Sequence, residues 1–297
     1  MRFDRLPHLG NRDFLGIPAA PTAKADNRAE ILLLMKTRIF PLGVRHWTLL
    51  FALVLLSGCY PIGNATRPIP TAFVPAPQTA HRLVVFLPGR GDDLDGLKKS
   101  GIAQIIQREW PDADVELAAV TMAYYLDGHA TLRLHNEVML PALKHGYEQI
   151  WLAGTSLGGM GTLTYDRDYP GEIYGMILLA PYLGDSTVPK EIAAAGGLEP
   201  WNPGPAETLG PNTWQRELWR YLKTWSVDPA RGRHVWLGYG DHDRLRKEIE
   251  LMSPTLRSSH VLMVPGGHNW KTWKVAAPQL LQDASRDAET PPTHAHN

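Results

Sequence analysis

A serine stands among glycines directly after a short apolar run, in WLAGTSLGGMG at residues 151–161. A serine hydroxyl is nucleophilic at neutral pH only beside a general base, and that base needs a carboxylate to fix its tautomer. The chain supplies both groups further on, because GYGDHD contains Asp241 and Asp243 and VPGGHNW contains His268. Ser156, an aspartate and His268 are therefore the residues that could transfer an acyl group through a covalent intermediate.

The elements that must position these residues are indicated by apolar runs of strand length that alternate with helix-length segments. Several of the runs are nearly continuous, which is typical of parallel strands covered on both faces. The alternation predicts βαβ crossovers and an α/β fold with a mostly parallel sheet and helices on both faces. We expect strands at 82–89, 114–120, 149–155, 174–182, 234–240 and 260–266, and helices near 95–109, 129–145, 157–168, 244–252 and 269–284.

Ser156 falls between the expected strand 149–155 and the expected helix 157–168, and Gly154 and Gly158 permit a sharp turn there. This strand, turn and helix resemble the nucleophile elbow of the α/β-hydrolase superfamily, and the resemblance extends over about residues 82–284. GGHNWKTW, around His268, also resembles the end of esterase D-type hydrolases. The resemblance implies an α/β-hydrolase fold with Ser156 as nucleophile and His268 as base.

Two aspartates compete for the role of the third catalytic residue. The superfamily turn Gly-x-x-Asp maps onto Gly240 to Asp243 and favours Asp243, with Asp241 as the alternative. Either carboxylate could instead cap the helix that begins near Arg244, since aspartate is a preferred cap. His242, between them, is expected to face solvent.

An oxyanion hole is the remaining requirement, and we expect it from two backbone N–H groups. The resemblance implies that one comes from Leu157, directly after the nucleophile, and the other from the loop LPGRGDD after the first core strand. Pro88-Gly89-Arg90 departs there from the common His-Gly pattern, and Arg90 is the candidate donor. The Arg90 side chain either pairs with Asp92 or Asp93 or binds a substrate carboxylate.

An insertion at residues 184–232 breaks the strand and helix rhythm and contains four of the ten tryptophans. Within it, the sequence spacing predicts a helix with one apolar face, made of Trp214, Leu218, Tyr221, Leu222 and Trp225. That face either packs on the core as part of a helical cap or forms a lid over the substrate. Substrate choice should depend on this insertion and on the surroundings of Tyr124 and Tyr125.

The single cysteine, Cys59, excludes an internal disulfide and follows a charged start, a ten-residue apolar run and small residues. LSGC, at residues 56–59, resembles the bacterial lipobox, which implies that 35–58 is a signal peptide and that Cys59 carries acyl chains. Residues 1–34 then precede the signal, and Met35 is the expected true start. We expect a Pro-rich tether at 59–80, a hydrolase domain at 81–286 and a flexible tail at 287–297.

The charge balance, thirty basic against thirty acidic residues, gives no patch suited to nucleic acid. These features together predict a serine hydrolase, carboxylesterase or lipase-like, that cleaves esters or thioesters of small or lipid-like substrates without a cofactor or metal. An acyltransferase with the same residues, and a non-catalytic envelope module with a Trp-rich recognition surface, are the alternatives. Tyr60 stands where lipoproteins retained at the inner membrane usually have Asp, so the resemblance implies the outer membrane, facing the periplasm.

Overall fold

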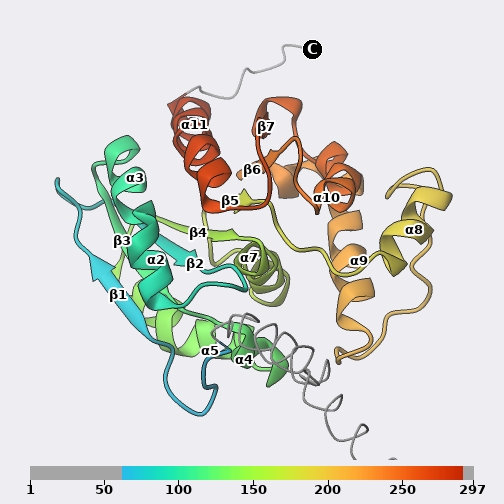
Figure 1. Cartoon of the computed structure of the whole chain (residues 1–297), viewed down its shortest axis with the longest axis horizontal. Helices are drawn as coiled ribbons and strands as arrows, with labels where there is room; N and C mark the ends of the chain where they lie inside the picture. Colours follow the sequence, from blue (N-terminus) through green and yellow to red (C-terminus); the bar gives the residue numbers. More distant parts are fainter. Residues whose placement is uncertain (1–61, 290–297) are drawn as a thin grey trace, which may run out of the picture. The chain divides into compact units, whose positions relative to one another are not determined.

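The computed structural model describes residues 62–289, and one sheet of seven strands runs through this part of the chain (Figure 1). Its strand order is β1-β3-β2-β4-β5-β6-β7. All neighbours pair in parallel except β1, which is antiparallel to β3. The strands are β1 (Thr71–Val74), β2 (Arg82–Leu87), β3 (Ala113–Ala118), β4 (Gln149–Thr155), β5 (Gly175–Leu179), β6 (Val235–Gly240) and β7 (Val261–Val264).

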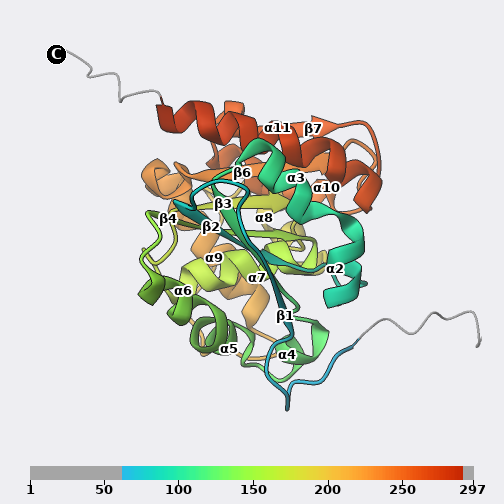
Figure 2. The same ribbon diagram turned by 90° about the vertical axis from the view of Figure 1, so that its left-hand side faces the viewer.

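Helices cover both faces of the sheet, as Figures 1 and 2 show. On one face α11 packs against α3 and against β5, β6 and β7. On the other face α7 packs against β2, β4 and β5 and contacts α5 and α9. The first layer comprises α2 (Leu94–Ser100), α3 (Ile102–Glu109) and α11 (Trp270–Glu289). The opposite layer contains α4 (Met122–Leu126), α5 (Ala130–Leu134), α6 (Leu140–His145) and α7 (Leu157–Asp168). The remaining α-helices are α8 (Thr187–Ala194), α9 (Trp214–Val227) and α10 (Arg246–Met252).

Strand β2 shows why the sheet needs two layers of helices. Successive side chains of a strand point to opposite faces. Val84 and Phe86 belong to the hydrophobic cluster that includes residues of α3 and α11, whereas Leu83, Val85 and Leu87 belong to a second cluster with residues of α5. Because both faces are buried, the strand continues after Arg82 as the uninterrupted apolar sequence LVVFL.

Two of the expected helices differ from the structure in their continuity. The segment 95–109 forms α2 and α3, separated by Gly101, whose φ of 72° ends α2 in the left-handed conformation. The segment 129–145 forms α5 and α6 joined by a π-helical turn at His135–Met139. The short helix α4, directly after β3, was not predicted.

Regular secondary structure begins before the expected domain start at residue 81, because β1 lies inside the expected tether 59–80 and pairs with β3. Ile69, just before β1, is buried, and its N–H donates to Glu137. At the other end α11 continues to Glu289, into the expected tail 287–297. The predicted signal peptide, Met35 and Cys59 lie outside the described residues. Within 62–289 none of the helices combines the length and apolar character that a bilayer crossing requires.

The insertion at 184–232 contributes α8 and α9, and α9 bears the predicted apolar face. Leu218, Leu222 and Trp225 of that face are completely buried, and α9 contacts α7. The Trp219 indole, also buried, donates from Nε1 to the Leu183 carbonyl oxygen at 2.9 Å. In the structure this face therefore packs on the core and does not form a lid over the substrate.

Candidate active site

Ser156 occupies a strained turn between β4 and α7. Its φ is 51° and its ψ is −111°, a backbone conformation that residues other than glycine rarely adopt. Two backbone hydrogen bonds hold it there: the Ser156 N–H donates to Leu179 at 2.9 Å, and the Ser156 carbonyl accepts from Tyr182 at 2.8 Å. The end of β5 thus fixes the turn from one side.

Gly158 lets the loop after β2 lie directly on the first turn of α7. A Cβ atom at this position would overlap the carbonyl oxygen of Leu87 and come within 2.7 Å of that of Pro88. A Cβ atom at Gly154 would in turn overlap the backbone of Gly158. Both glycines of the motif are therefore required by close backbone approach, which brings the loop from Leu87 to Gly89 next to Ser156.

The structure brings Ser156, His268 and Asp243 into direct contact. Nε2 of His268 lies 2.8 Å from Ser156 Oγ, and Nδ1 lies 2.9 Å from each carboxylate oxygen of Asp243. The three residues follow β4, β7 and β6, parallel strands whose carboxyl ends share one edge of the sheet. The Asp243 side chain is fully buried and the His268 side chain is 9% exposed. In the tautomer protonated on Nδ1, the ring donates to Asp243 and accepts from the Ser156 hydroxyl.

Asp241 has different partners. Its Oδ1 accepts a hydrogen bond from the Gly266 N–H at 2.8 Å and lies 2.7 Å from Nδ1 of the exposed His242. The Gly266 N–H, with help from His242, lowers the pKa of Asp241. This carboxylate therefore ties the loop after β7 to the loop after β6, while Asp243 is the one that contacts His268.

Asp243 also accepts a backbone hydrogen bond in the turn that leads into α10, whose N-cap residue is Leu245 and has no side-chain cap. Its Oδ1 accepts from the Leu245 N–H at 2.8 Å, just before α10. One carboxylate thus holds its own loop and the imidazole together.

The loop that carries the predicted donor Arg90 comes close to Ser156, and the other predicted donor, Leu157, directly follows Ser156 in the chain. A Cβ atom built on Gly89, the residue before Arg90, would be 3.6 Å from Cβ of Ser156. The Asp92 N–H closes a turn over Arg90 by donating to the Gly89 carbonyl at 3.1 Å. Leu157 is the first residue of α7, where a backbone N–H has no acceptor within the helix.

The aspartates of the same loop have partners that sequence reasoning missed. Asp92 accepts a hydrogen bond from Nε1 of Trp270 at 2.9 Å, and Asp93 caps α2 by accepting from the Gly96 N–H at 2.9 Å. Trp270 is the first residue of α11. Nothing in the amino-acid sequence indicates this bond, because 178 positions separate Trp270 from Asp92.

The two tyrosines expected near the substrate are largely interior. Tyr124 is buried and donates from its hydroxyl to backbone carbonyls of Arg67 and Pro68. The Tyr125 hydroxyl lies against Gly161 of α7, and among the described residues it has no hydrogen-bond partner. Burial raises the pKa of Tyr125.

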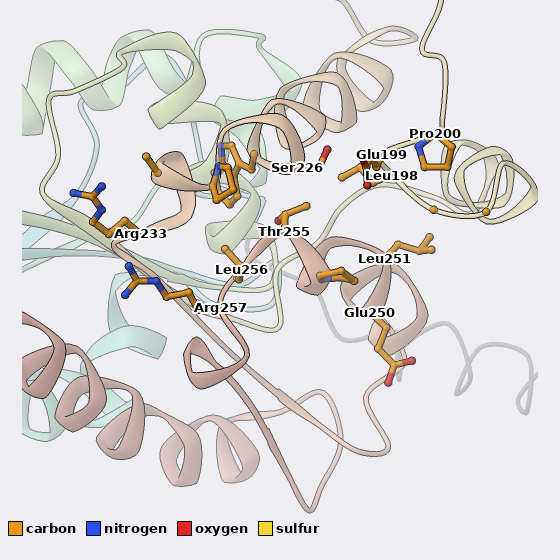
Figure 3. A pocket seen from close by; sticks show the side chains of 16 residues that line it. Leu198, Glu199, Pro200, Ser226, Arg233, Glu250, Leu251, Thr255, Leu256 and Arg257 are labelled. Atoms are coloured by element: carbon orange, nitrogen blue, oxygen red, sulfur yellow. The ribbon is translucent and has the colours of Figure 1, made fainter. Parts of the chain in front are cut away.

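A cavity of about 660 Å³ lies apart from these residues (Figure 3). Its walls come from the insertion, from the end of α10 and from the turn that follows α10, and they include Leu198, Glu199, Arg233, Leu256 and Arg257. Ser156, Asp243 and His268 do not line it. This cavity is therefore separate from the serine site.

The sequence model of the Esterase family matches residues 132–284, more than half of the 297 residues and a range that contains Ser156, Asp243 and His268. The chain belongs to the Esterase family. This esterase is thus a hydrolytic enzyme whose family acts on small-molecule esters. No curated protein sequence matches it.

Solved structures similar to this esterase include Est1E from Butyrivibrio proteoclasticus, at 12% identity and a TM-score of 0.50, with 77% of this chain and 98% of that chain covered. An S-formylglutathione hydrolase from Agrobacterium tumefaciens matches at 16% identity and a TM-score of 0.49, covering 73% of this chain and 90% of its own. A thermophilic esterase from Thermogutta terrifontis matches at 17% identity and 0.47, covering 75% and 95%. The similarity to Est1E, together with the sheet and its helices, confirms the α/β-hydrolase fold.

Proposed function

We propose that this esterase hydrolyses carboxylic esters or thioesters through an acyl-enzyme on Ser156. The observation that carries the proposal is the unbroken contact from Ser156 Oγ through the His268 ring to the buried Asp243 carboxylate. Such a chain activates a serine hydroxyl, because the imidazole accepts its proton and the carboxylate stabilises the imidazolium.

The reaction divides into two acyl transfers. In the first, Ser156 Oγ bonds to the carbonyl carbon as its proton moves to Nε2 of His268, and the alcohol or thiol leaves with that proton as its bond to the carbonyl carbon breaks. In the second, His268 takes a proton from water, whose oxygen attacks the acyl-enzyme, and then returns the proton to Ser156 Oγ as the carboxylic acid is released. Atoms and protons balance without any further reactant.

Charge develops on the carbonyl oxygen in both steps, and in this proposal the backbone N–H groups of Arg90 and Leu157 bind it. Fixed donors of this kind stabilise the transition state more than the substrate. The amino end of α7 adds a favourable partial positive charge beside Ser156.

Of the alternatives, the non-catalytic module finds little support. It needs exposed tryptophans in the insertion, whereas Trp201, Trp219 and Trp225 are buried. Acyl transfer to an acceptor other than water would use the same residues, and we treat it as one outcome of the experiment below.

A fluorescent fluorophosphonate probe tests the proposal, because it phosphonylates only an activated serine. We expect rapid labelling of the native protein and of Ser226→Ala, a control at a serine outside the contact chain, and no labelling of Ser156→Ala. Release of p-nitrophenol from esters graded by acyl length, and of thiol from matching thioesters, then gives the substrate class. Labelling that persists in Ser156→Ala would refute the proposal, and acyl products formed with added alcohols would favour the transferase.

We propose further that the enzyme works in the bacterial cell envelope, anchored by acyl chains on Cys59 after removal of residues 35–58, and that it faces the periplasm from the outer membrane. The charged start, apolar run and LSGC sequence support this. Lipid chains of this kind anchor a protein without a spanning helix.

Metabolic labelling with radioactive palmitate tests the anchor. The native chain should incorporate label and fractionate with the outer membrane, whereas Cys59→Ser should lose both properties. Ser57→Ala, which keeps a small residue before Gly58, is the matched control and should behave like the native chain. Equal labelling of Cys59→Ser and the native chain would overturn the proposal.

A further inference from the structure

We propose that Asp92 and Trp270 form a positioning pair that holds the oxyanion loop against the helix that follows His268. The proposal rests on the proposed function, since it concerns how two parts of that site keep their relative place. The oxyanion loop is defined here as residues 88–92.

The pair joins two distant segments at the catalytic edge of the sheet. Nε1 of Trp270 donates to Oδ2 of Asp92 at 2.9 Å. Asp92 lies two residues after Arg90, the candidate oxyanion donor, and Trp270 lies two residues after His268 and begins α11. A single hydrogen bond therefore links the loop that binds the oxyanion to the element that carries the base.

Asp92 is itself held firmly on the loop side. Its N–H closes the turn on Gly89, and its Oδ1 lies so close to Gly96 of α2 that a Cβ atom there would be only 2.7 Å away. Asp93, the next residue, caps the same helix. Because the carboxylate is fixed between the turn and α2, its hydrogen bond to Trp270 also holds Arg90 in place relative to α11.

Trp270 is held on the histidine side by a path of aromatic contacts. Its ring lies 6.2 Å from Phe86 at the end of β2, and 5.3 Å from Trp273 at an interplanar angle of 80°. Trp273, which is buried, meets the His268 ring edge-on, with centroids 5.1 Å apart and an angle of 88°. Movement of Trp270 would therefore disturb the packing beside the imidazole.

The catalytic consequence follows from what each group does during the reaction. The Arg90 N–H matters most when the oxyanion forms, and the His268 ring must at that moment remain aligned with Ser156. A displacement of about 1 Å can cost on the order of a hundredfold in rate. Loosening the pair should thus lower kcat and leave KM almost unchanged, because substrate binding precedes the development of charge.

Four variants separate this role from a merely structural one. Asp92→Ala and Trp270→Phe remove acceptor and donor, and we expect each to lower kcat about 10- to 100-fold with little change in KM or Tm. Asp92→Asn keeps an oxygen acceptor and should restore kcat to within a few fold of the native value. The double variant should be no slower than the slower single variant, because both changes break one interaction.

Asp93→Ala is the matched control, since it removes the carboxylate of the residue that directly follows the oxyanion loop and loosens the cap of α2. It should lower Tm and leave kcat within a few fold. Unchanged kcat in both Asp92→Ala and Trp270→Phe, or an Asp92→Asn variant as slow as Asp92→Ala, would overturn the proposal.

Two further readouts keep the test independent of the proposed function. The indole N–H resonance of Trp270, assigned by its loss in Trp270→Phe, should be protected from hydrogen exchange in the native protein and in Asp92→Asn, and exposed in Asp92→Ala. Equal protection in Asp92→Ala would refute the pair even if no substrate were found. Failure of the native protein to react with fluorophosphonate would instead refute the proposed function.

Discussion

At the scale of single residues, the catalytic edge distinguishes two aspartates that stand two positions apart. Asp243 accepts from the Leu245 N–H and contacts the imidazole, whereas Asp241 accepts from the Gly266 N–H. The first arrangement fixes the tautomer and orientation of His268. The second fixes only the loop in which His268 lies, so the two carboxylates should differ sharply in their effect on rate.

Exchange of each aspartate for asparagine measures this difference. Asp243→Asn keeps the shape but removes the charge that stabilises the imidazolium and favours the wrong tautomer, so kcat should fall on the order of 10⁴-fold. Asp241→Asn should lower kcat less than tenfold, because its amide oxygen can still accept from Gly266. Steady-state hydrolysis of a p-nitrophenyl ester provides the comparison. Equal losses in the two variants would contradict the assignment of Asp243.

At the scale of elements, the site depends on how closely α7 approaches the loop after β2. Gly158 makes this approach possible, because the place that a Cβ atom would take there is filled by the carbonyl groups of Leu87 and Pro88. Any side chain there must push the elbow away from the oxyanion loop. The spacing of these two elements therefore sets the distance between nucleophile and oxyanion donors.

Gly158→Ala should separate the two elements. We expect a loss of about 1–3 kcal/mol in the free energy of unfolding, from overpacking, and fluorophosphonate labelling slowed by more than tenfold. Gly210→Ala is the control, because a Cβ atom there would make only an ordinary 3.7 Å contact with Thr213, and its stability should change by less than about 0.5 kcal/mol. Chemical denaturation and the labelling rate give the two values. Native stability and labelling in Gly158→Ala would show that the elements can move apart freely.

Elements also differ in how well the sequence foretells them. Strand β5, GMILL, is buried at every position, and such continuous apolar runs identify parallel strands directly. The stretch from Ala130 to His145 contains a single helix breaker, Pro141, in the first turn of α6, and the apolar spacing does not reveal the π-helical turn at His135–Met139 that precedes it. Gly101, in contrast, is a residue type that commonly ends helices, and it separates α2 from α3 with a φ of 72°.

At the scale of the whole molecule, the strand topology makes the contact among Ser156, Asp243 and His268 predictable. It does not make predictable the hydrogen bonds that support these residues. Parallel strands place their carboxyl ends at one edge, so residues that follow β4, β6 and β7 must meet there. The bond between Asp92 and Trp270 depends instead on the exact orientation of α11 over the sheet. Neither apolar periodicity nor motif spacing contains that orientation.

Strand β1 has a consequence for how the molecule avoids associating with itself. An uncovered strand edge presents unpaired N–H and carbonyl groups that can recruit another chain. By pairing antiparallel to β3, TAFV covers that edge of the parallel sheet and leaves a final strand of only four residues, as β7 does on the far side. By covering the edge of β3, the Pro-rich stretch that contains β1 should reduce aggregation through strand pairing between molecules. A recombinant protein that began at His81 would lack this protection.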